Sequence, residues 1–209
     1  DRQAAIEAIR QSGGFVGILG DDHCQPRSPF SFAPAASGPI ETVEVFNAKV
    51  AKAALWRTGI HSHPDELRIL RAPLDDLDIE KLKAFRRLHT LDLFHGRITK
   101  VAFANLRSLI SLKRLVIRGT EIDDSELREL QHLPQLSELV LNGTGITDAG
   151  LEEIGRIETL RQLSVGGTRI SDEGLQHVAK LQELTQLDLA NTEITDEAVA
   201  HLCQLPNRR

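Results

Sequence analysis

Apolar residues recur with a 24-residue period between Leu88 and Leu205. Each copy opens on a leucine, places a second leucine three residues later, and places a third apolar residue two positions beyond it. The opening column consists of Leu88, Leu112, Leu136, Leu160 and Leu184. Because one frame is repeated five times, the sequence predicts stacked copies of a single structural unit.

The apolar spacing changes within each copy. Leu139 and Leu141 are two residues apart, which is typical of a short strand with one buried face. Leu151, Ile154 and Ile157 are three residues apart, which favours a short helix or 3₁₀ turn with one apolar face. Since so short a unit cannot bury its own apolar stripe, neighbouring units must share one core. The pattern therefore predicts a curved α/β solenoid.

The segment Thr144–Leu151, T-G-I-T-D-A-G-L, and its counterpart Thr168–Leu175 resemble a leucine-rich repeat, and the resemblance extends over about Ile40 to Leu205. This form is similar to the cysteine-containing-like subclass found in F-box substrate receptors and many bacterial proteins. The resemblance implies a right-handed leucine-rich repeat solenoid, with a parallel sheet on its concave side and short helices on its convex side. Gly96 departs from a column where the family usually has Asn or Cys. We expect the threonines of that column to satisfy turn amides: Thr120, Thr144, Thr168 and Thr192.

The spacing also predicts a division of the chain. Residues 1–39 are predicted to hold a helix over Arg2–Gln11, a strand over Phe15–Leu19 and a Pro-rich loop. Residues 40–209 are predicted to form about seven units, the first of them atypical. The stretch Gln3–Val16 resembles the region before the repeats in planctomycete-type bacterial proteins, which often carry a membrane anchor just upstream. We expect Phe15–Leu19 to cover the edge of the first repeat strand.

A column of carboxylates has two interpretations. Asp124, Asp148, Asp172 and Asp196 recur every 24 residues, as in a ladder of calcium ligands. Calcium needs about six to eight oxygens converging on one point, so helix capping is favoured. Thr147, Ser171 and Thr195 precede the last three aspartates as N-cap candidates, and Asp123 with Glu126 predicts a capping box.

Other motifs do not support an enzyme, a metal site or a cofactor. Gly14, Gly17 and Gly20 lack the strand, turn and helix order of a phosphate-binding loop. His23 and Cys24 are neighbours in a loop, with no orienting group. Two histidine pairs lack third and fourth zinc ligands and are interpreted as surface residues: His61 with His63, and His177 with His201.

Composition limits the partners and leaves the compartment open. The net charge is −5 and no basic stripe follows the repeats, so nucleic acid is not an expected partner. No apolar run approaches the roughly 20 residues that span a bilayer. The chain begins at Asp1 and contains no Met, so we interpret it as part of a longer or processed chain with an upstream signal or anchor. Cys24 and Cys203 form no disulfide framework. The soluble portion of an N-terminally membrane-anchored bacterial protein and a cytoplasmic protein both remain open.

Two functions from different classes fit a repeat scaffold. The first is a non-catalytic scaffold that binds a protein or peptide through its concave face, and the second is a structural spacer or assembly element of a larger membrane-anchored protein. A binder needs clustered large or charged side chains, whereas a spacer needs only small polar ones. A ubiquitin-ligase receptor is disfavoured because no F-box sequence is present.

Alternation along the strands predicts the concave surface. The surface is predicted to hold an apolar patch rimmed by arginines, made of Leu70, Phe94, Val116 and Val140. Ser164 and Gly166 are small and offer a partner few side-chain atoms to contact. The proposed partner-binding residues are Arg68, Leu70, Asp92, Phe94, Arg114, Val116, Arg118, Glu138 and Val140. In the alternative, Pro26–Pro39 folds across this face. We expect a monomer, or a weak dimer through the edge strand Gln186–Ala190.

Overall fold

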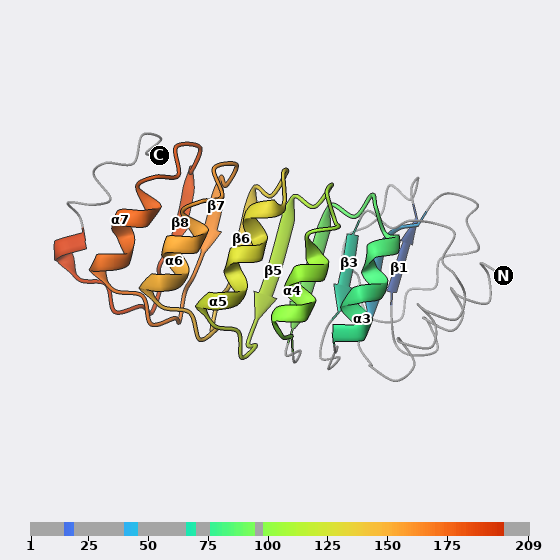
Figure 1. Cartoon of the computed structure of the whole chain (residues 1–209), viewed down its shortest axis with the longest axis horizontal. Helices are drawn as coiled ribbons and strands as arrows, with labels where there is room; N and C mark the ends of the chain where they lie inside the picture. Colours follow the sequence, from blue (N-terminus) through green and yellow to red (C-terminus); the bar gives the residue numbers. More distant parts are fainter. Residues whose placement is uncertain (1–14, 19–39, 46–65, 70–75, 95–97, 199–209) are drawn as a thin grey trace.

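The computed structural model describes residues 15–18, 40–45, 66–69, 76–94 and 98–198. In these residues one eight-stranded sheet runs along the molecule, and short helices cover one of its faces (Figure 1). The strands are β1 (Phe15–Ile18), β2 (Ile40–Val45), β3 (Glu66–Ile69), β4 (Thr90–Phe94), β5 (Arg114–Arg118), β6 (Glu138–Val140), β7 (Gln162–Ser164) and β8 (Gln186–Asp188).

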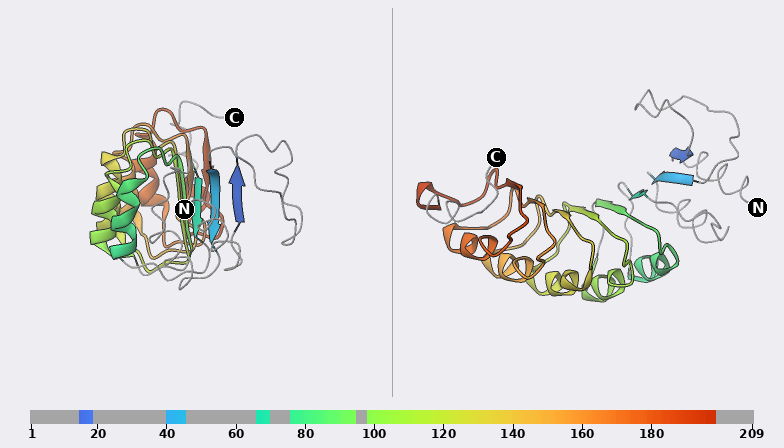
Figure 2. Two further views of the ribbon diagram at one scale, coloured as in Figure 1. Left: turned by 90° about the vertical axis from the view of Figure 1, so that its right-hand side faces the viewer. Right: turned by 90° about the horizontal axis from the view of Figure 1, so that it is seen from above.

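The other layer is made of α-helices and 3₁₀ turns. The α-helices are α3 (Asp76–Lys81), α4 (Lys100–Leu106), α5 (Asp124–Leu127), α6 (Asp148–Ile154) and α7 (Leu175–Val178). The 3₁₀ turns are η1 (Leu82–Ala84), η2 (Arg128–His132), η3 (Asp172–Gly174) and η4 (Asp196–Ala198). Seen from above, the strands line the concave side of a curved molecule and the helices line its convex side (Figure 2). The predicted α/β solenoid is confirmed.

The strands follow one another in chain order and in a constant register. From β2 to β8 each strand is parallel to the next, and partners are 24 residues apart, as in Leu91, Leu115 and Leu139. β1 pairs antiparallel with β2, with Val16 opposite Val43. The edge of the first parallel strand is therefore covered by the segment predicted for it. The Arg2–Gln11 helix and the loop Pro26–Pro39 lie outside the described residues.

One apolar core lies between the sheet and the helices. Leu115 and Leu139 are fully buried against it, and Leu163 is 2% exposed. Leu187, at the same position of the repeat on β8, is only partly buried. β8 is the last strand of the described sheet, so among these residues Leu187 has a strand on one side only. Dimerisation through this edge remains a prediction.

The threonine column closes the turn that leaves each strand. Gly143 and Gly167 precede Thr144 and Thr168 with φ values of +67° and +69°, a conformation that glycine adopts without a steric cost. The hydroxyl of Thr144 donates to the Leu141 carbonyl at 2.7 Å, and Thr168 makes the equivalent bond one unit later. The predicted hydrogen bond from the threonine column to the turn backbone is therefore present, but its partner is a carbonyl and not an amide.

Thr120 breaks the regularity of this column. Its hydroxyl is buried but has no hydrogen-bond partner among the described residues. At the other end of the column, Thr192 donates to the Leu189 carbonyl at 2.7 Å. The threonines thus share a position in the repeat without sharing the same bond.

Candidate interaction surface

The concave face is formed by alternate side chains of the strands. On β5, Leu115 and Ile117 belong to the core, so the residues that alternate with them point away from the helices. The strand register aligns these residues in rows that cross the sheet. One row contains Thr90, Arg114, Glu138, Gln162 and Gln186, and the next contains Asp92, Val116, Val140, Ser164 and Asp188.

Ion pairs join the strands at the centre of this face. The Nε atom of Arg114 lies 3.9 Å from Asp92 Oδ1, and its Nη1 atom contacts Glu138 Oε1. Asp92 is buried, whereas Arg114 and Glu138 are half-buried. A partly desolvated arginine between two carboxylates holds β4, β5 and β6 together at their concave surface. The predicted residues Asp92, Arg114 and Glu138 are thus brought together.

Two members of the predicted apolar patch are buried. Val116 is 1% exposed and Val140 is 6% exposed, so neither offers the apolar contact that was expected. Val116 lies between Arg114 and Arg118 on its own strand and faces Asp92 on the next. A valine is short, so its longer neighbours on a curved sheet shield it from solvent. Arg118 is exposed, as predicted.

The remaining residues of the predicted surface are described less fully. Arg68 lies on β3 and Phe94 on β4, opposite Arg118, and their side chains are outside the described part. Leu70 lies outside the described residues altogether. Their membership of the surface stays a prediction.

A polar network that was not predicted occupies the other half of the face. Ser164 Oγ lies 2.7 Å from both Asn142 Oδ1 and Asp188 Oδ2. One hydroxyl carries one proton, and a carboxylate is the stronger acceptor, so the proton goes to Asp188. Asp188 Oδ1 also accepts from the Ala190 N–H at 3.1 Å. The Ser164 hydroxyl and then the Ala190 N–H hold the pKa of the Asp188 carboxyl below its usual value.

This network carried a weak signal in the sequence. Ser164 and Asp188 occupy outward positions of β7 and β8, and Asn142 follows β6; each is adjacent to an inward apolar residue. Small polar side chains at such positions were interpreted as offering little grip. That interpretation overlooked the fact that the register places their polar atoms within hydrogen-bond distance.

The aspartate column on the convex side joins neighbouring units. Asp124 Oδ1 accepts from the Thr147 N–H at 2.8 Å, and its Oδ2 accepts from the Thr147 hydroxyl at 2.7 Å. Asp148 makes the same two bonds to Ser171 at 2.8 and 2.6 Å. Helix capping within one unit was predicted to explain this column, and that explanation is incomplete. The carboxylates of Asp124, Asp148 and Asp172 each reach the cap residue of the next unit.

Capping itself is partly confirmed. Ser171 accepts from the Glu173 N–H, and Asp123 forms the predicted capping box with Glu126. Thr147 stands at the N-cap of α6 and donates its hydroxyl to Asp124, but it makes no side-chain capping bond. The Ser171 hydroxyl, in contrast, both donates to Asp148 and accepts from the Glu173 N–H.

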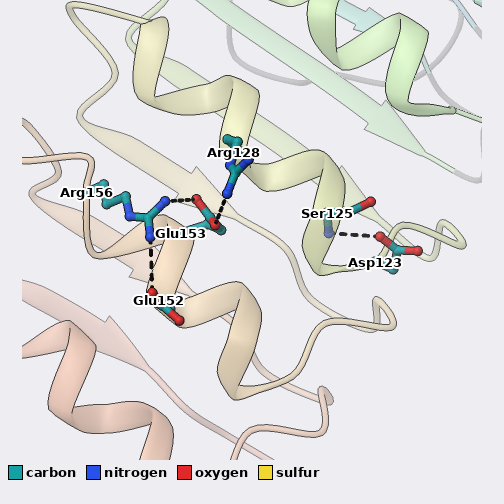
Figure 3. A network of polar contacts seen from close by, with 6 residues as sticks. All are labelled: Asp123, Ser125, Arg128, Glu152, Glu153 and Arg156. Atoms are coloured by element: carbon teal, nitrogen blue, oxygen red, sulfur yellow. Dashed lines mark hydrogen bonds and ion pairs between the residues drawn. The ribbon is translucent and has the colours of Figure 1, made fainter.

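Further ion pairs lie on the convex surface. Glu153 Oε1 lies 3.5 Å from Arg128 Nη2, and Glu153 Oε2 lies 2.7 Å from Arg156 Nη1 (Figure 3). Arg156 also contacts Glu152 at 3.0 Å. The arginines are exposed, and each such pair contributes about 0–1 kcal/mol, so this network supports the helix layer only modestly.

The described residues contain no cluster of three or more His, Cys, Asp or Glu side chains suited to a metal ion. His177 is half-exposed and has its Nδ1 3.3 Å from Lys180 Nζ. His23, Cys24, His61, His63, His201 and Cys203 lie outside the described residues. Within the described part of the chain, no helix has the length and apolar character that crossing a membrane requires.

Comparisons with family models agree with this architecture. Residues 86–146 match a leucine rich repeat model, and residues 157–179 and 180–203 match a second one. The solved structure of an internalin from Listeria monocytogenes is 18% identical, with a TM-score of 0.41, and the match covers 69% of this chain and 54% of that chain. No curated protein matches. The repeat matches and the observed solenoid together identify the chain as a leucine-rich repeat protein.

Proposed function

We propose that this protein is a non-catalytic scaffold that binds a protein or peptide through its concave face. The observation that carries the proposal is the continuous parallel sheet, which aligns outward side chains from successive strands in ordered rows. Solenoids of stacked repeats use such extended concave faces for binding. The exposed Arg118 and Asp188 mark two charged positions along it.

The roles of the predicted residues follow from their exposure. Arg118 is exposed, and Arg114 and Glu138 are half-buried, so these three are proposed to contact the partner. Asp92, Val116 and Val140 are buried and are proposed to support that surface from beneath. Arg68, Leu70 and Phe94 remain proposed contacts.

The alternative function is a structural spacer or assembly element of a larger membrane-anchored protein. Burial of Val116 and Val140 favours it, because an interface usually has exposed apolar anchors at its centre. Together with this alternative we propose that the repeats are of the cysteine-containing-like subclass and that the chain resembles planctomycete-type bacterial proteins. A spacer would bind no peptide specifically, which separates the two functions experimentally.

Short peptides selected from a random display library against the whole chain test the proposal. We expect Arg118→Glu to weaken the selected peptides by about tenfold or more, because it reverses a charge in the contact surface. Arg107→Glu is the matched control, because Arg107 is an exposed arginine at the end of α4 on the convex side. Recovery of no specific peptide, or equal affinity for the wild-type chain and all concave variants, would contradict the proposed function.

A further inference from the structure

The two halves of the concave face differ in how their charges are paired. On β4–β6, Arg114 is paired with Asp92 and Glu138. On β7 and β8 the outward positions hold a single ionisable side chain, Asp188, among glutamines and small residues. Asp188 is exposed and forms no ion pair with any residue that the structure describes. This half of the face therefore presents a negative charge with no described cation beside it.

Asp188 is held in a fixed position. Its two oxygens accept from the Ser164 hydroxyl and from the Ala190 N–H, and Ser164 is itself in contact with Asn142. The lowered pKa of the Asp188 carboxyl keeps this group ionised near neutral pH. A charged group that is already ordered loses little conformational entropy when it pairs with a ligand.

The carboxylate also retains acceptor capacity and space. An ionised carboxylate has about four acceptor sites, and two are occupied by these hydrogen bonds. Gln186 is exposed and Gln162 is half-exposed, so their amide oxygens supply further acceptors on the same strands. Because Asp188 is exposed, a long cationic side chain of a partner can lie beside it.

We propose that the concave face of β6–β8 binds a protein segment by pairing a lysine or arginine side chain of that segment with Asp188. This inference rests on the proposed function and adds the chemistry of the partner. A basic side chain fits because the face offers one carboxylate surrounded by neutral acceptors. Nucleic acid carries the opposite charge from the one required. The described residues also lack the three-residue cluster that would hold a metal ion instead.

The same selected peptides test the pairing directly. We expect them to contain a basic residue and to bind Asp188→Asn about tenfold more weakly than the wild-type chain. Replacing that basic residue with Gln should weaken binding to the wild-type chain equally and should have no further effect on Asp188→Asn. Raising the NaCl concentration should weaken wild-type binding more than binding to Asp188→Asn.

One control variant and one folding check accompany this experiment. Glu197→Gln removes an exposed carboxylate from η4 in the same unit and should leave affinity unchanged. Asp188→Asn is nearly isosteric, and its unfolding midpoint establishes that the variant is folded. Peptides that lose affinity for Arg118→Glu but bind Asp188→Asn normally would overturn the pairing and leave the proposed function standing. Peptides that bind Arg118→Glu and Asp188→Asn with unchanged affinity would overturn both the pairing and the proposed function.

The chain also contains two arginines, Arg208 and Arg209, that lie outside the described residues. The double variant Arg208→Gln, Arg209→Gln therefore provides a further arm of the experiment. Unchanged affinity supports pairing of Asp188 with an external partner. A clear gain in affinity, abolished by Asp188→Asn, would show that these arginines compete for Asp188 and would assign the site to the chain itself.

Discussion

The junction between α4 and α5 is built differently from the other junctions on the convex side. At four junctions an aspartate of one unit accepts from both the backbone N–H and the hydroxyl of the cap residue in the next unit. These pairs are Asp76–Thr99, Asp124–Thr147, Asp148–Ser171 and Asp172–Thr195. Between α4 and α5, Lys100 occupies the aspartate column and Asp123 occupies the cap position.

Both arrangements satisfy the same backbone donor. The Thr147 N–H is bonded to Asp124 of the preceding unit, whereas the Asp123 N–H is bonded at 2.8 Å to Glu126 of its own unit. A buried or helix-terminal N–H without a partner is costly, so each junction needs one of the two solutions. The first solution links two units, and the second closes within one.

The two solutions exclude each other in space. Three residues after the cap stands Ala102, Gly150, Gly174 or Ala198 at the linked junctions, and Glu126 at the exception. A Cβ atom at Gly150 would lie 2.5 Å from Asp124 Oδ1, and the other linked junctions hold nothing larger than alanine here, so the linking carboxylate leaves room for a methyl group at most. A larger residue fits only where the preceding aspartate is absent, as at Lys100. The α4–α5 junction therefore lacks the aspartate link that the other four junctions have.

The largest expected effect comes from the core, which crosses both kinds of junction. Leu115 on β5 and Leu163 on β7 belong to the same apolar cluster. Leu115→Ala and Leu163→Ala should each lower the free energy of unfolding by about 2–5 kcal/mol, because each leaves a cavity between strand and helix layers. Urea denaturation measures both. A clearly smaller loss for Leu115→Ala would mean that the core is loosely packed beside the exceptional junction.

The next effect isolates a linked junction. Asp148→Ala removes the acceptor of two hydrogen bonds from Ser171, and we expect a loss of about 1–3 kcal/mol in the free energy of unfolding. Asp196→Ala is the matched control, because this aspartate of the column has no hydrogen bond or ion pair to a described residue. Its effect should stay within about 0.5 kcal/mol. Equal losses for the two variants would show that the column acts through helix capping after all.

A third set of changes gives the α4–α5 junction the residues found at the linked junctions. Lys100→Asp alone places a carboxylate near Asp123 and Glu126, and we expect it to destabilise the chain by about 1 kcal/mol. Adding Asp123→Thr and Glu126→Gly supplies the hydroxyl and the space found at the other junctions. The triple variant should recover at least the lost stability, as measured by urea denaturation. If the three changes are simply additive, the two solutions are independent rather than mutually exclusive.

The repeat frame made much of this predictable. The period of Leu115, Leu139 and Leu163 predicted the strands, the register and the core, because burial of a repeated apolar stripe admits few arrangements. The aspartate links were missed because local capping and bonding to the next unit use the same residue types at the same positions. The substitutions at Lys100 and Glu126 were the available signal, since they depart from the frame together.

The candidate site was less predictable than the fold. Alternation placed Val116 and Val140 on the outward rows correctly, but their burial depends on how Arg114 and its neighbours lie across a curved sheet. A sequence pattern specifies the face of a strand and not the conformations of long side chains around it. For the same reason the contact of Ser164 with Asn142 and Asp188 became evident only from distances.

The smallest expected effect concerns the acid–base behaviour of the exceptional junction. A hydrogen bond from Glu126 and another from the Ser125 N–H hold the pKa of Asp123 below its usual value of 3.8. Partial burial and then the hydrogen bond to Asp123 raise the pKa of Glu126 above its usual value of 4.5. Glu126→Ala removes the first cause, so the pKa of Asp123 should move upward towards its usual value. Titration of the side-chain carboxyl signals by NMR measures this.

The two shifts have opposite signs in the stability of the chain. A lowered pKa means that Asp123 contributes stability above its unfolded-state pKa and loses it as the pH falls through the folded value. A raised pKa means that Glu126 contributes stability below its unfolded-state pKa and loses it as the pH rises through the folded value. In the wild-type chain the contributions of Asp123 and Glu126 should therefore largely cancel across the acid range. In Glu126→Ala only the contribution of Asp123 remains, so the variant should lose stability as the pH falls. Asp188, whose pKa is lowered by Ser164, is the internal control and should titrate identically in both proteins. An unchanged titration of Asp123 in Glu126→Ala would mean that the Ser125 N–H alone sets its pKa and that the junction is not closed through Glu126.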